Sequence, residues 1–439
     1  MKRINYIFLV LSLIGLASCM DKYTEIYTAN SPVYLSYDEL RSAVKPTDPT
    51  ELINPGKIYF KDSFLFVVEK LKGIHVFDMS VPSSPQNLRF IPVPGCVDIA
   101  IKNDILYADS YVDLVAIDVS SMNAVKEVGR VKDVFPYTVP PTNNELRVEQ
   151  IDQTKGIVTA WEITREKREI NYQNVPVYPV WSYYNSSYAL YDAAGGFKGG
   201  AELSSSGTTA ASYGKSGSMA RFGLYDKYLY SVDNNMVYTF NIQNPASPVK
   251  LGVQYLGWNI ETMFLYDDHM FLGTSSGMII ASLQNPLIPT QVGSYAHVTS
   301  CDPVIVDNGY AYVTLRGGQT CRNTTVNRLD VLKLATDYKT VNPVAFYNLT
   351  NPHGLGIDGN TLFVCDGSDG LKVYDCTDKT TIDQHMIKAF PAIQSYDVIP
   401  VNTSKYLFMV GDGGFYLYDY NNLNDIRQIA KIDVKVDNN

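Results

Sequence analysis

A histidine and a set of carboxylates are the first candidates for chemistry in this chain of 439 residues. His353 lies in the segment NPHGLG and is one of only five histidines. Its unperturbed pKa of about 6.5 would let it exchange protons near neutral pH, so beside carboxylates it could act as a general base. The alternative is a structural histidine that is hydrogen-bonded in a turn. The other histidines have no HxH or HExxH spacing, so the sequence predicts no protein-only zinc site.

Nucleotide-binding and redox motifs are absent from the sequence. It contains no P-loop or CxxC pattern, so a phosphate cradle and a redox pair have no support. The pattern GxSxG occurs once, as GTSSG (273–277), but it links two β-rich runs, whereas a hydrolase elbow needs a strand followed by a helix. An aspartate instead recurs at the end of several apolar runs, at Asp78, Asp118, Asp375 and Asp419. Because a turn-capping aspartate is needed once per repeat and a catalytic one only once per protein, we expect these four to cap turns.

These residues belong to a repeated phrase of short strands. The clearest part is a run of apolar residues that ends in a turn residue. It occurs as GIHVFD (73–78), DLVAID (113–118), MVYTFN (236–241), GMIIAS (277–282), RLDVLK (328–333), GLKVYD (370–375) and GFYLYD (414–419). Except across one long gap after residue 118, successive copies start about 40–50 residues apart, which fits a propeller blade of roughly 40–45 residues.

A second strand rich in aromatic and β-branched residues precedes each of these runs. The copies are FLFVVE (64–69), ILYADS (105–110), YLYSVD (228–233), MFLGTS (270–275), YAYVTL (310–315), TLFVCD (361–366) and YLFMVG (406–411). Seven such pairs predict an all-β, seven-bladed β-propeller of four-stranded blades over residues 52–432, with a long insertion at 132–218 after the second blade. The segment GIVTAWEI (156–163) leaves an eighth blade open as an alternative.

Alignment of the blades on the second strand places one position at the start of each innermost strand. These positions hold Lys57, Asp98, Arg221, Glu261, Asp302, Gly354 and Asp397. They would ring one mouth of the central channel, next to His353, and could grip a polar ligand or a cation. Oxygen ligands suit calcium, although no DxDxDG-type loop is present. The alternative is a hydrated mouth where neighbouring strands pair their charges.

The insertion changes from a Tyr-rich to a Gly/Ser-rich composition and has no sustained period. Its aromatic cluster includes Trp181, Tyr183 and Tyr184, which could stack on sugar rings or anchor a protein partner. The alternative, equally open on the sequence, is an insertion that buries its own aromatic side chains.

The N-terminus has the features of an export signal. Lys2 and Arg3 precede an apolar stretch that is too short to span a bilayer. The ending Leu-Ala-Ser-Cys resembles a bacterial lipobox, so we expect a signal peptide at 1–18 and a lipid on Cys19. Because Met20 follows the cysteine, analogy with lipoprotein sorting favours the outer membrane of a Gram-negative bacterium. We expect a flexible polar tether at 19–32 and a short helix or turn at 33–51.

Five cysteines remain in the exported chain, an odd number that leaves at least one free thiol. Cys301 precedes a first strand, and Cys321 lies in the loop between the second and third strands of the same blade. Both loops lie on one face of a propeller, so a Cys301–Cys321 disulfide is expected, with two unpaired thiols as the alternative.

The net charge of −9 and the lack of a Lys/Arg cluster argue against nucleic acid or an anionic membrane face as a partner. The phrases DLVAID, GLKVYD, SPVYLSYDELRSAV, NPGKIYFKD, SCDPVIVDNGYAYVTLRGG and NPHGLGIDG resemble segments of the LVIVD-repeat lipoproteins, found largely in Bacteroidetes. The resemblance covers nearly all of residues 32–430 outside the insertion. It implies the propeller fold and says little about activity.

Together these observations predict a cell-envelope lipoprotein that acts as a non-enzymatic binding or scaffolding module for a protein or glycan. No cofactor is implied beyond the calcium considered for the ring. The alternative is a hydrolase or lyase with its site at the channel mouth, where His353 would act beside the carboxylates.

Overall fold

The computed structural model describes residues 23–170, 215–216, 220–297, 303–318 and 325–435. The chain divides into two compact units, one of Met1–Tyr37 with Thr138–Tyr188 and one of Asp38–Tyr137 with Ala189–Asn439. Among the described residues, no helix is long and apolar enough to cross a membrane.

The larger unit consists of antiparallel sheets whose strands follow one another in chain order, except for the short β12, which is added beside β2 in the first sheet. The first sheet has the order β12-β2-β3-β4-β5 and the second the order β6-β7-β8-β9. Their strands are β12 (Lys215–Ser216), β2 (Pro55–Lys61), β3 (Phe64–Glu69), β4 (Gly73–Asp78), β5 (Gln86–Pro92), β6 (Ile99–Lys102), β7 (Ile105–Ser110), β8 (Asp113–Asp118) and β9 (Lys126–Val131).

A six-stranded sheet follows and contains two copies of the sequence repeat. Its strands are β13 (Phe222–Tyr225), β14 (Tyr228–Asn241), β15 (Val249–Tyr266), β16 (His269–Thr274), β17 (Gly277–Ser282) and β18 (Thr290–Ala296). The long β14 covers both the second and the third strand of one repeat. Strand β15 changes its partner near Ile260. The part before this residue pairs with β14, and the part after it pairs with β16.

Three four-stranded sheets complete the larger unit. They contain β19 (Val304–Asp307), β20 (Tyr310–Leu315), β21 (Arg328–Leu334) and β22 (Val341–Asn348), then β23 (Leu355–Asp358), β24 (Thr361–Cys365), β25 (Leu371–Asp375) and β26 (Met386–Phe390), and last β27 (Ser395–Val401), β28 (Tyr406–Gly411), β29 (Gly414–Asp419) and β30 (Arg427–Asp433). The second and third strands agree with the sequence prediction to within one residue at each end, apart from the merged β14.

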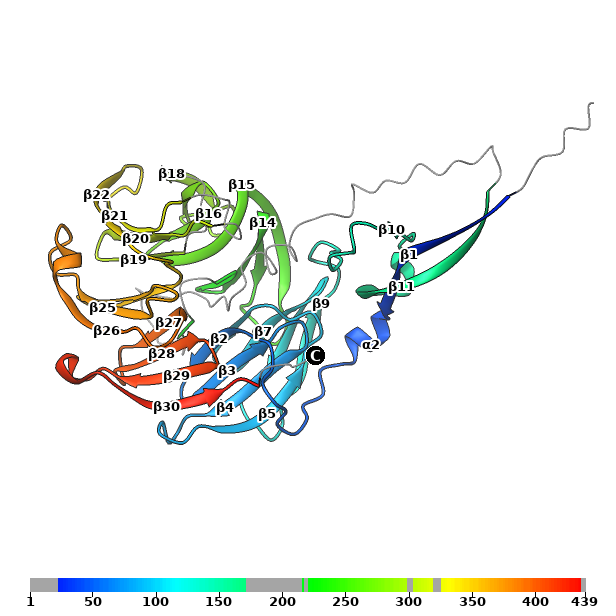
Figure 1. The fold of residues 1–439 in the computed structure, drawn as a ribbon, viewed down its shortest axis with the longest axis horizontal. Helices are drawn as coiled ribbons and strands as arrows, with labels where there is room; N and C mark the ends of the chain where they lie inside the picture. The colour runs from blue at the N-terminus through cyan, green and yellow to red at the C-terminus, as the bar shows by residue number, and fades with distance from the viewer. Residues whose placement is uncertain (1–22, 171–214, 217–219, 298–302, 319–324, 436–439) are drawn as a thin grey trace, which may run out of the picture. The chain divides into compact units, whose positions relative to one another are not determined.

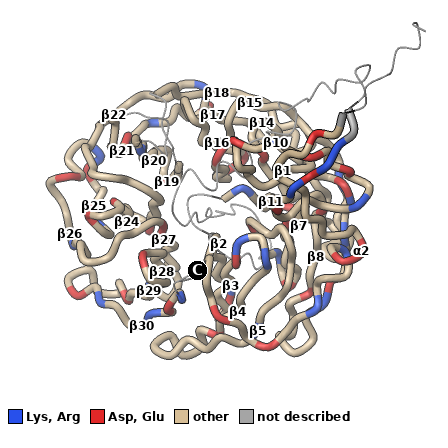
Figure 2. Tube along the Cα trace, turned by 45° about the vertical axis from the view of Figure 1, so that its right-hand side comes forward, with Lys and Arg blue, Asp and Glu red and all other residues tan. Residues whose placement is uncertain are grey.

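The sheets of this unit lie around a common centre, as Figures 1 and 2 show. Contacts join the first strands in order, from β2 to β6, β6 to β13, β15 to β19, β19 to β23 and β23 to β27. The circle is closed by an apolar cluster in which Ile58 and Leu65 of the first sheet pack with Ile399 and Phe408 of the last.

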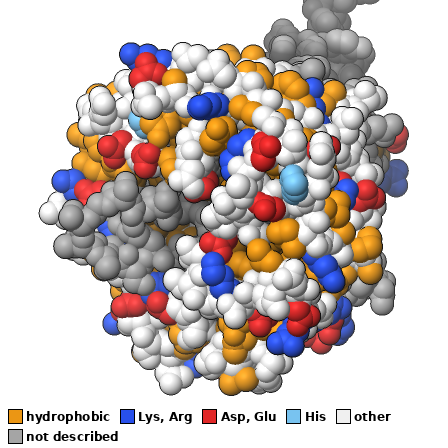
Figure 3. Space-filling model, turned by 90° about the vertical axis from the view of Figure 1, so that its left-hand side faces the viewer, with side chains coloured by type: hydrophobic (Ala, Val, Ile, Leu, Met, Phe, Trp, Pro, Cys, Tyr) orange, Lys and Arg blue, Asp and Glu red, His pale blue; other side chains and the backbone are white. Residues whose placement is uncertain are grey.

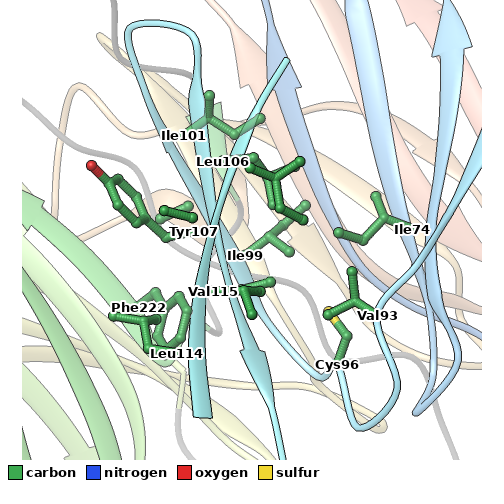
Figure 4. Close-up of a cluster of buried hydrophobic side chains, with 14 of the residues drawn as sticks. Ile74, Val93, Cys96, Ile99, Ile101, Leu106, Tyr107, Leu114, Val115 and Phe222 are labelled. Carbon is green, nitrogen blue, oxygen red and sulfur yellow. The ribbon is translucent and has the colours of Figure 1, made fainter. Parts of the chain in front are cut away.

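Apolar side chains between neighbouring sheets hold the circle together. One cluster joins the first two sheets through Ile74, Val93, Cys96, Ile99 and Leu106, and extends to Phe222 of the third repeat (Figure 4). All but Phe222 are at most 1% exposed. Burial of one side chain of this size stabilises a fold by about 1.5–3 kcal/mol. The contacts between neighbouring sheets therefore contribute much of the stability of the larger unit.

Tyrosines of the second strands reach the proline turns of the next repeat. The hydroxyl of Tyr107 donates to the carbonyl of Pro245 over 2.9 Å, and that of Tyr230 donates to the carbonyl of Pro286 over 2.7 Å. The aromatic body fills the space between two sheets while the hydroxyl satisfies a turn carbonyl. The second strand thus fixes the turn that precedes the next outer strand.

The four repeated aspartates cap turns, as the sequence predicts. A carboxylate oxygen of each accepts the backbone N–H two residues later, from Ser80, Ser120, Thr377 and Asn421 respectively. Hydrogen bonds from the side-chain hydroxyls of Ser120 and Thr377, together with these backbone bonds, hold the pKa of Asp118 and of Asp375 below its usual range. The repeated aspartates are therefore local turn-forming residues.

The smaller unit differs from the sequence prediction. Strand β1 (Tyr23–Leu35) pairs along its whole length with the antiparallel β11 (Ile157–Ile170) and, at Ala29–Asn30, with the parallel β10 (Arg147–Val148). Residues 23–32, expected to be a flexible tether, are therefore in a sheet. Strand β11 runs beyond the segment GIVTAWEI and includes the charged residues that follow it, as far as Ile170.

Side chains explain why these segments pair. The amide of Asn30 is buried and donates to the carbonyl of Asn143 over 3.0 Å, and the hydroxyl of Tyr27 donates to Glu149 over 2.6 Å. Trp161 donates from its ring N–H to the carbonyl of Pro140 over 2.8 Å. Residues 157–170 belong to this three-stranded sheet, so they do not supply a four-stranded blade.

The expected short N-terminal helix is present as α2 (Tyr37–Arg41). Leu40 is fully buried, and Val44 packs into the cluster between the first two sheets. Within the insertion at 132–218, Val134 and Phe135 also pack on that cluster, and β12 pairs with β2.

Candidate functional site

The described ring residues lie at the ends of the first strands and form two connected clusters. We call Lys57, Asp98, Asp109 and Arg221 the lysine cluster. We call Glu261, Arg316, His353 and Tyr396 the histidine cluster. Asp397 lies between them, because it is close enough to attract Lys57 and its carboxylate packs against Gly354, which follows His353.

Asp98 is the centre of the lysine cluster. Its side chain is almost fully buried, and its Oδ2 lies 3.5 Å from the ammonium of Lys57. The same oxygen accepts the backbone N–H groups of Arg221, over 2.6 Å, and of Phe222, over 3.1 Å. Its Oδ1 accepts the N–H of Ile99 over 2.8 Å. This one carboxylate therefore joins the first strands of three successive repeats.

The two cations of this cluster have different surroundings. Burial lowers the pKa of Lys57, and the attraction of Asp98 partly offsets this effect. Arg221 donates from Nε to the carbonyl of Val232 over 3.1 Å and from Nη2 to Asp233 over 3.0 Å. The guanidinium keeps some exposure and is the cation of this cluster that a ligand could reach.

Asp109 is a second carboxylate at this point, and it was not a candidate on the sequence. Its Oδ1 accepts the N–H groups of Val97, over 2.8 Å, and of Asp98, over 3.0 Å. Desolvation raises the pKa of this carboxyl to about 6, although the two backbone bonds oppose the shift. Asp109 therefore fixes the loop that positions Asp98.

An acidic residue near the end of the second strand recurs in this role. Glu69 accepts the N–H groups of Ile53 and Asn54, and Asp366 accepts those of Thr350 and Asn351. The signal is visible in the strands FLFVVE, ILYADS and TLFVCD, where an acidic residue ends an apolar run. It marks a loop anchor, because a carboxylate that accepts two backbone N–H groups replaces the hydrogen bonds that these donors lose on burial.

His353 is held in place by Arg316, whose Nη1 lies 2.6 Å from Nδ1 and 2.9 Å from Nε2 of the ring. The ring also packs edge-on against Tyr396, with centroids 5.2 Å apart, and is 5% exposed. Burial lowers the pKa of Arg316 to about 10, so the guanidinium stays protonated at neutral pH. Because a guanidinium can only donate, the ring nitrogen that faces it must accept.

The remaining members connect this cluster to the circle. Glu261 attracts Arg316, and the hydroxyl of Tyr396 donates to Asp412 over 2.5 Å. Burial raises the pKa of that tyrosine above its usual range. Arg316 lies just after a second strand, and Tyr396 lies beside the ring position Asp397. The blade alignment selected only the ring positions, so neither residue was a candidate on the sequence.

Acidic and basic residues are distributed over all sheets of the larger unit (Figure 2), and both signs occur among apolar side chains on the face shown in Figure 3. Among the described residues, no group of three or more His, Cys, Asp or Glu side chains is arranged to hold a metal ion. In the lysine cluster, backbone N–H groups and Lys57 already occupy the oxygens of Asp98. The oxygens of Asp98 are therefore already engaged by groups of the chain itself.

Several predicted site residues lie outside the described residues. They are Asp302, Trp181, Tyr183, Tyr184, the lipid-bearing Cys19 and the disulfide pair Cys301 and Cys321. Of the other cysteines, Cys96, Cys365 and Cys376 are buried free thiols, which agrees with the prediction of at least one unpaired cysteine.

No protein-family model matches the chain, and no curated protein sequence matches it. Among solved structures, the periplasmic gluconolactonase PpgL of Pseudomonas aeruginosa is similar with a TM-score of 0.52 and 8% identity, over 94% of this chain and 98% of that one. A functionally unknown protein of Desulfotomaculum acetoxidans reaches a TM-score of 0.49 at 11% identity, over 86% and 100%. A putative 6-phosphogluconolactonase of Bacteroides uniformis reaches 0.47 at 10% identity, over 84% and 95%.

The likeness to PpgL, at 8% identity, concerns the fold alone. Together with the circle of antiparallel sheets, it identifies the larger unit as a β-propeller.

Proposed function

We propose that this chain is a lipid-anchored protein of a Gram-negative outer membrane whose propeller binds a protein or glycan partner without chemically changing it. The propeller has seven blades: the six-stranded sheet counts as two, because β14 contains the second and third strands of one repeat, and β15 contains the outer strand of that repeat and the first strand of the next. Strand β12 is an addition to the first blade. The chain belongs to the LVIVD-repeat type that its repeated strands resemble.

This proposal rests on one observation: the ionisable groups of the two clusters are bound by other groups of the chain itself. Asp98 and Asp109 accept backbone N–H groups, and the ring of His353 faces the guanidinium of Arg316. A general base needs a nitrogen lone pair directed at the proton that it removes. Proton abstraction by His353 would first require the loss of its contact with Arg316. This arrangement favours a rigid, charged recognition surface over a catalytic one.

The recognition surface is formed by the groups that keep solvent contact at this end of the propeller. Arg221, Asp233 and Glu261 are half-buried there and present both signs of charge. A rigid surface of fixed charges gives specificity with little ordering cost on binding. The aromatic residues Trp181, Tyr183 and Tyr184 are a separate set of proposed anchors for a partner.

The second reading is a hydrolase or lyase that uses His353 at the channel mouth. Its support is the proximity of His353, Arg316 and Glu261 in one cluster. A buried cation beside a histidine could stabilise a developing oxyanion. The activity named for PpgL does not transfer at 8% identity, but sugar lactones belong among the substrates to test.

Pull-down from the protein's own envelope tests the binding proposal. The full chain and a variant that lacks residues 171–217 are compared, and the expected result is a protein or glycan partner that only the full chain retains strongly. Recovery of no partner by the full chain would contradict the proposal.

Labelling with palmitate tests the anchor. Label is expected in the wild-type chain and not in Cys19→Ala. Failure of the wild type to take up label, or persistence of label in the variant, would contradict lipid attachment at Cys19.

A further inference from the structure

The outer strand of the third repeat exposes an unusual series of apolar side chains. In the first part of β15, alternate residues are exposed: Val249 by 55%, Leu251 by 43%, Val253 by 44% and Tyr255 by 47%. Trp258 follows at 70% and packs edge-on against Tyr255, with ring centroids 5.7 Å apart. We call these five residues the β15 strip. Such concentrated apolar exposure on one strand is typical of an interaction surface.

Most other outer strands carry groups that discourage pairing. β5, β9, β22, β26 and β30 contain, in order, Arg89 and Pro92, Lys126 and Arg130, Pro343, Lys388, and Arg427, Lys431 and Asp433. In β18 the residues Thr290, Gln291 and Ser294 are exposed and polar. Charges and prolines on edge strands are the usual protection against association with another sheet edge. The β15 strip lacks this protection.

The edge itself is open within the described part of the chain. Residues 249–255 pair with β14 on one side, and no described strand pairs with their other side. A Cβ atom added at Gly252, in the middle of the strip, would meet nothing within 4 Å. The one charged residue of this stretch, Lys250, directs its ammonium to the carbonyl of Val134 over 3.0 Å.

We propose that the β15 strip is the interface of a symmetric dimer, in which β15 pairs antiparallel with β15 of a second copy. A two-fold axis through Gly252 would place Val249 opposite Tyr255 of the other copy, and Leu251 opposite Val253. Lys250 would then face Gln254, so no like charges meet. A two-fold interface must be self-complementary in this way, and apolar cross-strand pairs stabilise antiparallel strands.

The size of the strip sets the expected strength. A stable interface buries roughly 800 Å² on each partner. Each aromatic residue can bury about 150–250 Å², so Tyr255 and Trp258 supply a substantial part and the three aliphatic side chains add to it. The strip alone falls short of that size. The dimer is therefore expected to be weak and to dissociate on dilution, while each propeller stays folded.

Sedimentation velocity of the full chain over a dilution series tests this inference. The wild type should shift from dimer to monomer on dilution. Val253→Lys should weaken dimerisation by about tenfold or more, since one desolvated charge readily exceeds the free energy of a tenfold change. Ser294→Lys is the matched control. Ser294 pairs with Ile279 in the fourth repeat, just as Val253 pairs with Tyr238 in the third, so the two residues have equivalent places in their outer strands. It should leave dimerisation unchanged.

Cross-linking provides a second test that does not need a disruptive variant. Residues that face each other on a two-fold axis of paired strands have Cα atoms about 4.5–5.5 Å apart, within reach of a disulfide. Gly252→Cys should therefore give a disulfide-linked dimer on mild oxidation, and Ser294→Cys should not. A wild-type chain that stays monomeric at the highest concentration would overturn the proposal. So would equal dimerisation of wild type and Val253→Lys, or capture by the strip of a different protein instead of a second copy.

Discussion

Replacement of Asp98 by alanine should destabilise the propeller more than loss of any exposed ion pair. The substitution removes the partner of the buried Lys57 and the acceptor of the Ile99, Arg221 and Phe222 backbone N–H groups. Removing one partner of a buried ion pair costs about 3–5 kcal/mol, and each unsatisfied buried donor costs about 1–3 kcal/mol. Because Asp397 still attracts Lys57 and water can reach part of the site, we expect a total loss of about 4 kcal/mol.

Urea unfolding monitored by circular dichroism measures this loss, with Asp104→Ala as the control. Asp104 is 62% exposed in its side chain and pairs with Lys61 over 3.7 Å, so its removal should cost under about 1 kcal/mol. Adding Lys57→Met to Asp98→Ala should recover part of the stability, because it removes the uncompensated charge. If Asp98→Ala unfolds at the same urea concentration as the control, the assignment of Asp98 as the residue that joins three repeats is wrong.

The remaining predictions concern pH, a loop anchor and the insertion. The pKa of Asp109 is about 6 in the folded state, which is above its value in the unfolded chain. The stability that its protonated form contributes is therefore present at pH below about 4 and is lost as pH rises through about 6. Asp109→Asn should remove this pH dependence, which we expect to be at most about 2 kcal/mol because the carboxyl keeps some solvent contact. Asp366→Ala should speed hydrogen exchange at the N–H groups of Thr350 and Asn351, and unchanged exchange there would refute its anchoring role. Trp181→Ala should weaken partner binding by about tenfold while the melting temperature stays nearly constant, since a buried aromatic anchor contributes on the order of 2 kcal/mol to an interface; a sharp fall in melting temperature would instead make it a core residue.

The repeat made most of the propeller predictable. Strands such as Phe64–Glu69 and Asp113–Asp118 begin and end where alternating apolar residues and turn aspartates place them. These signals are local, and the same turn chemistry is needed in every blade. Strand β14 spans two of the predicted strands together with the residues that link them, Asn234 and Asn235. The turn of the other repeats is kept there, because Asn234 has a positive φ of 49° and the N–H of Ile242 donates to the carbonyl of Lys227 over 2.8 Å.

The smaller unit could not be predicted in the same way. β1 and β11 are about 130 residues apart in the sequence, and neither contains the repeat. The side-chain hydrogen bonds that join them involve polar residues, such as those of Ser31 with Thr164 and with Glu166. A polar segment with these residues is compatible with a tether or a strand, and only the partner decides between them.

The candidate site was predictable in location and not in its internal pairing. The ring positions follow from the blade alignment, which is why Lys57, Asp98 and Arg221 meet. The alignment used only first-strand positions, so it missed Asp109 and Arg316, which come from the ends of second strands. Which charge neutralises which depends on side-chain directions that the spacing does not specify.

The central claim, binding without catalysis, is tested most directly by mass spectrometry of envelope glycans, peptides and sugar lactones after incubation with the purified full chain. The account predicts that every component keeps its mass and that the partner is recovered unchanged, with wild type and His353→Ala giving the same spectra. A product that wild type forms and His353→Ala does not form would contradict the account and assign a catalytic role to the histidine cluster.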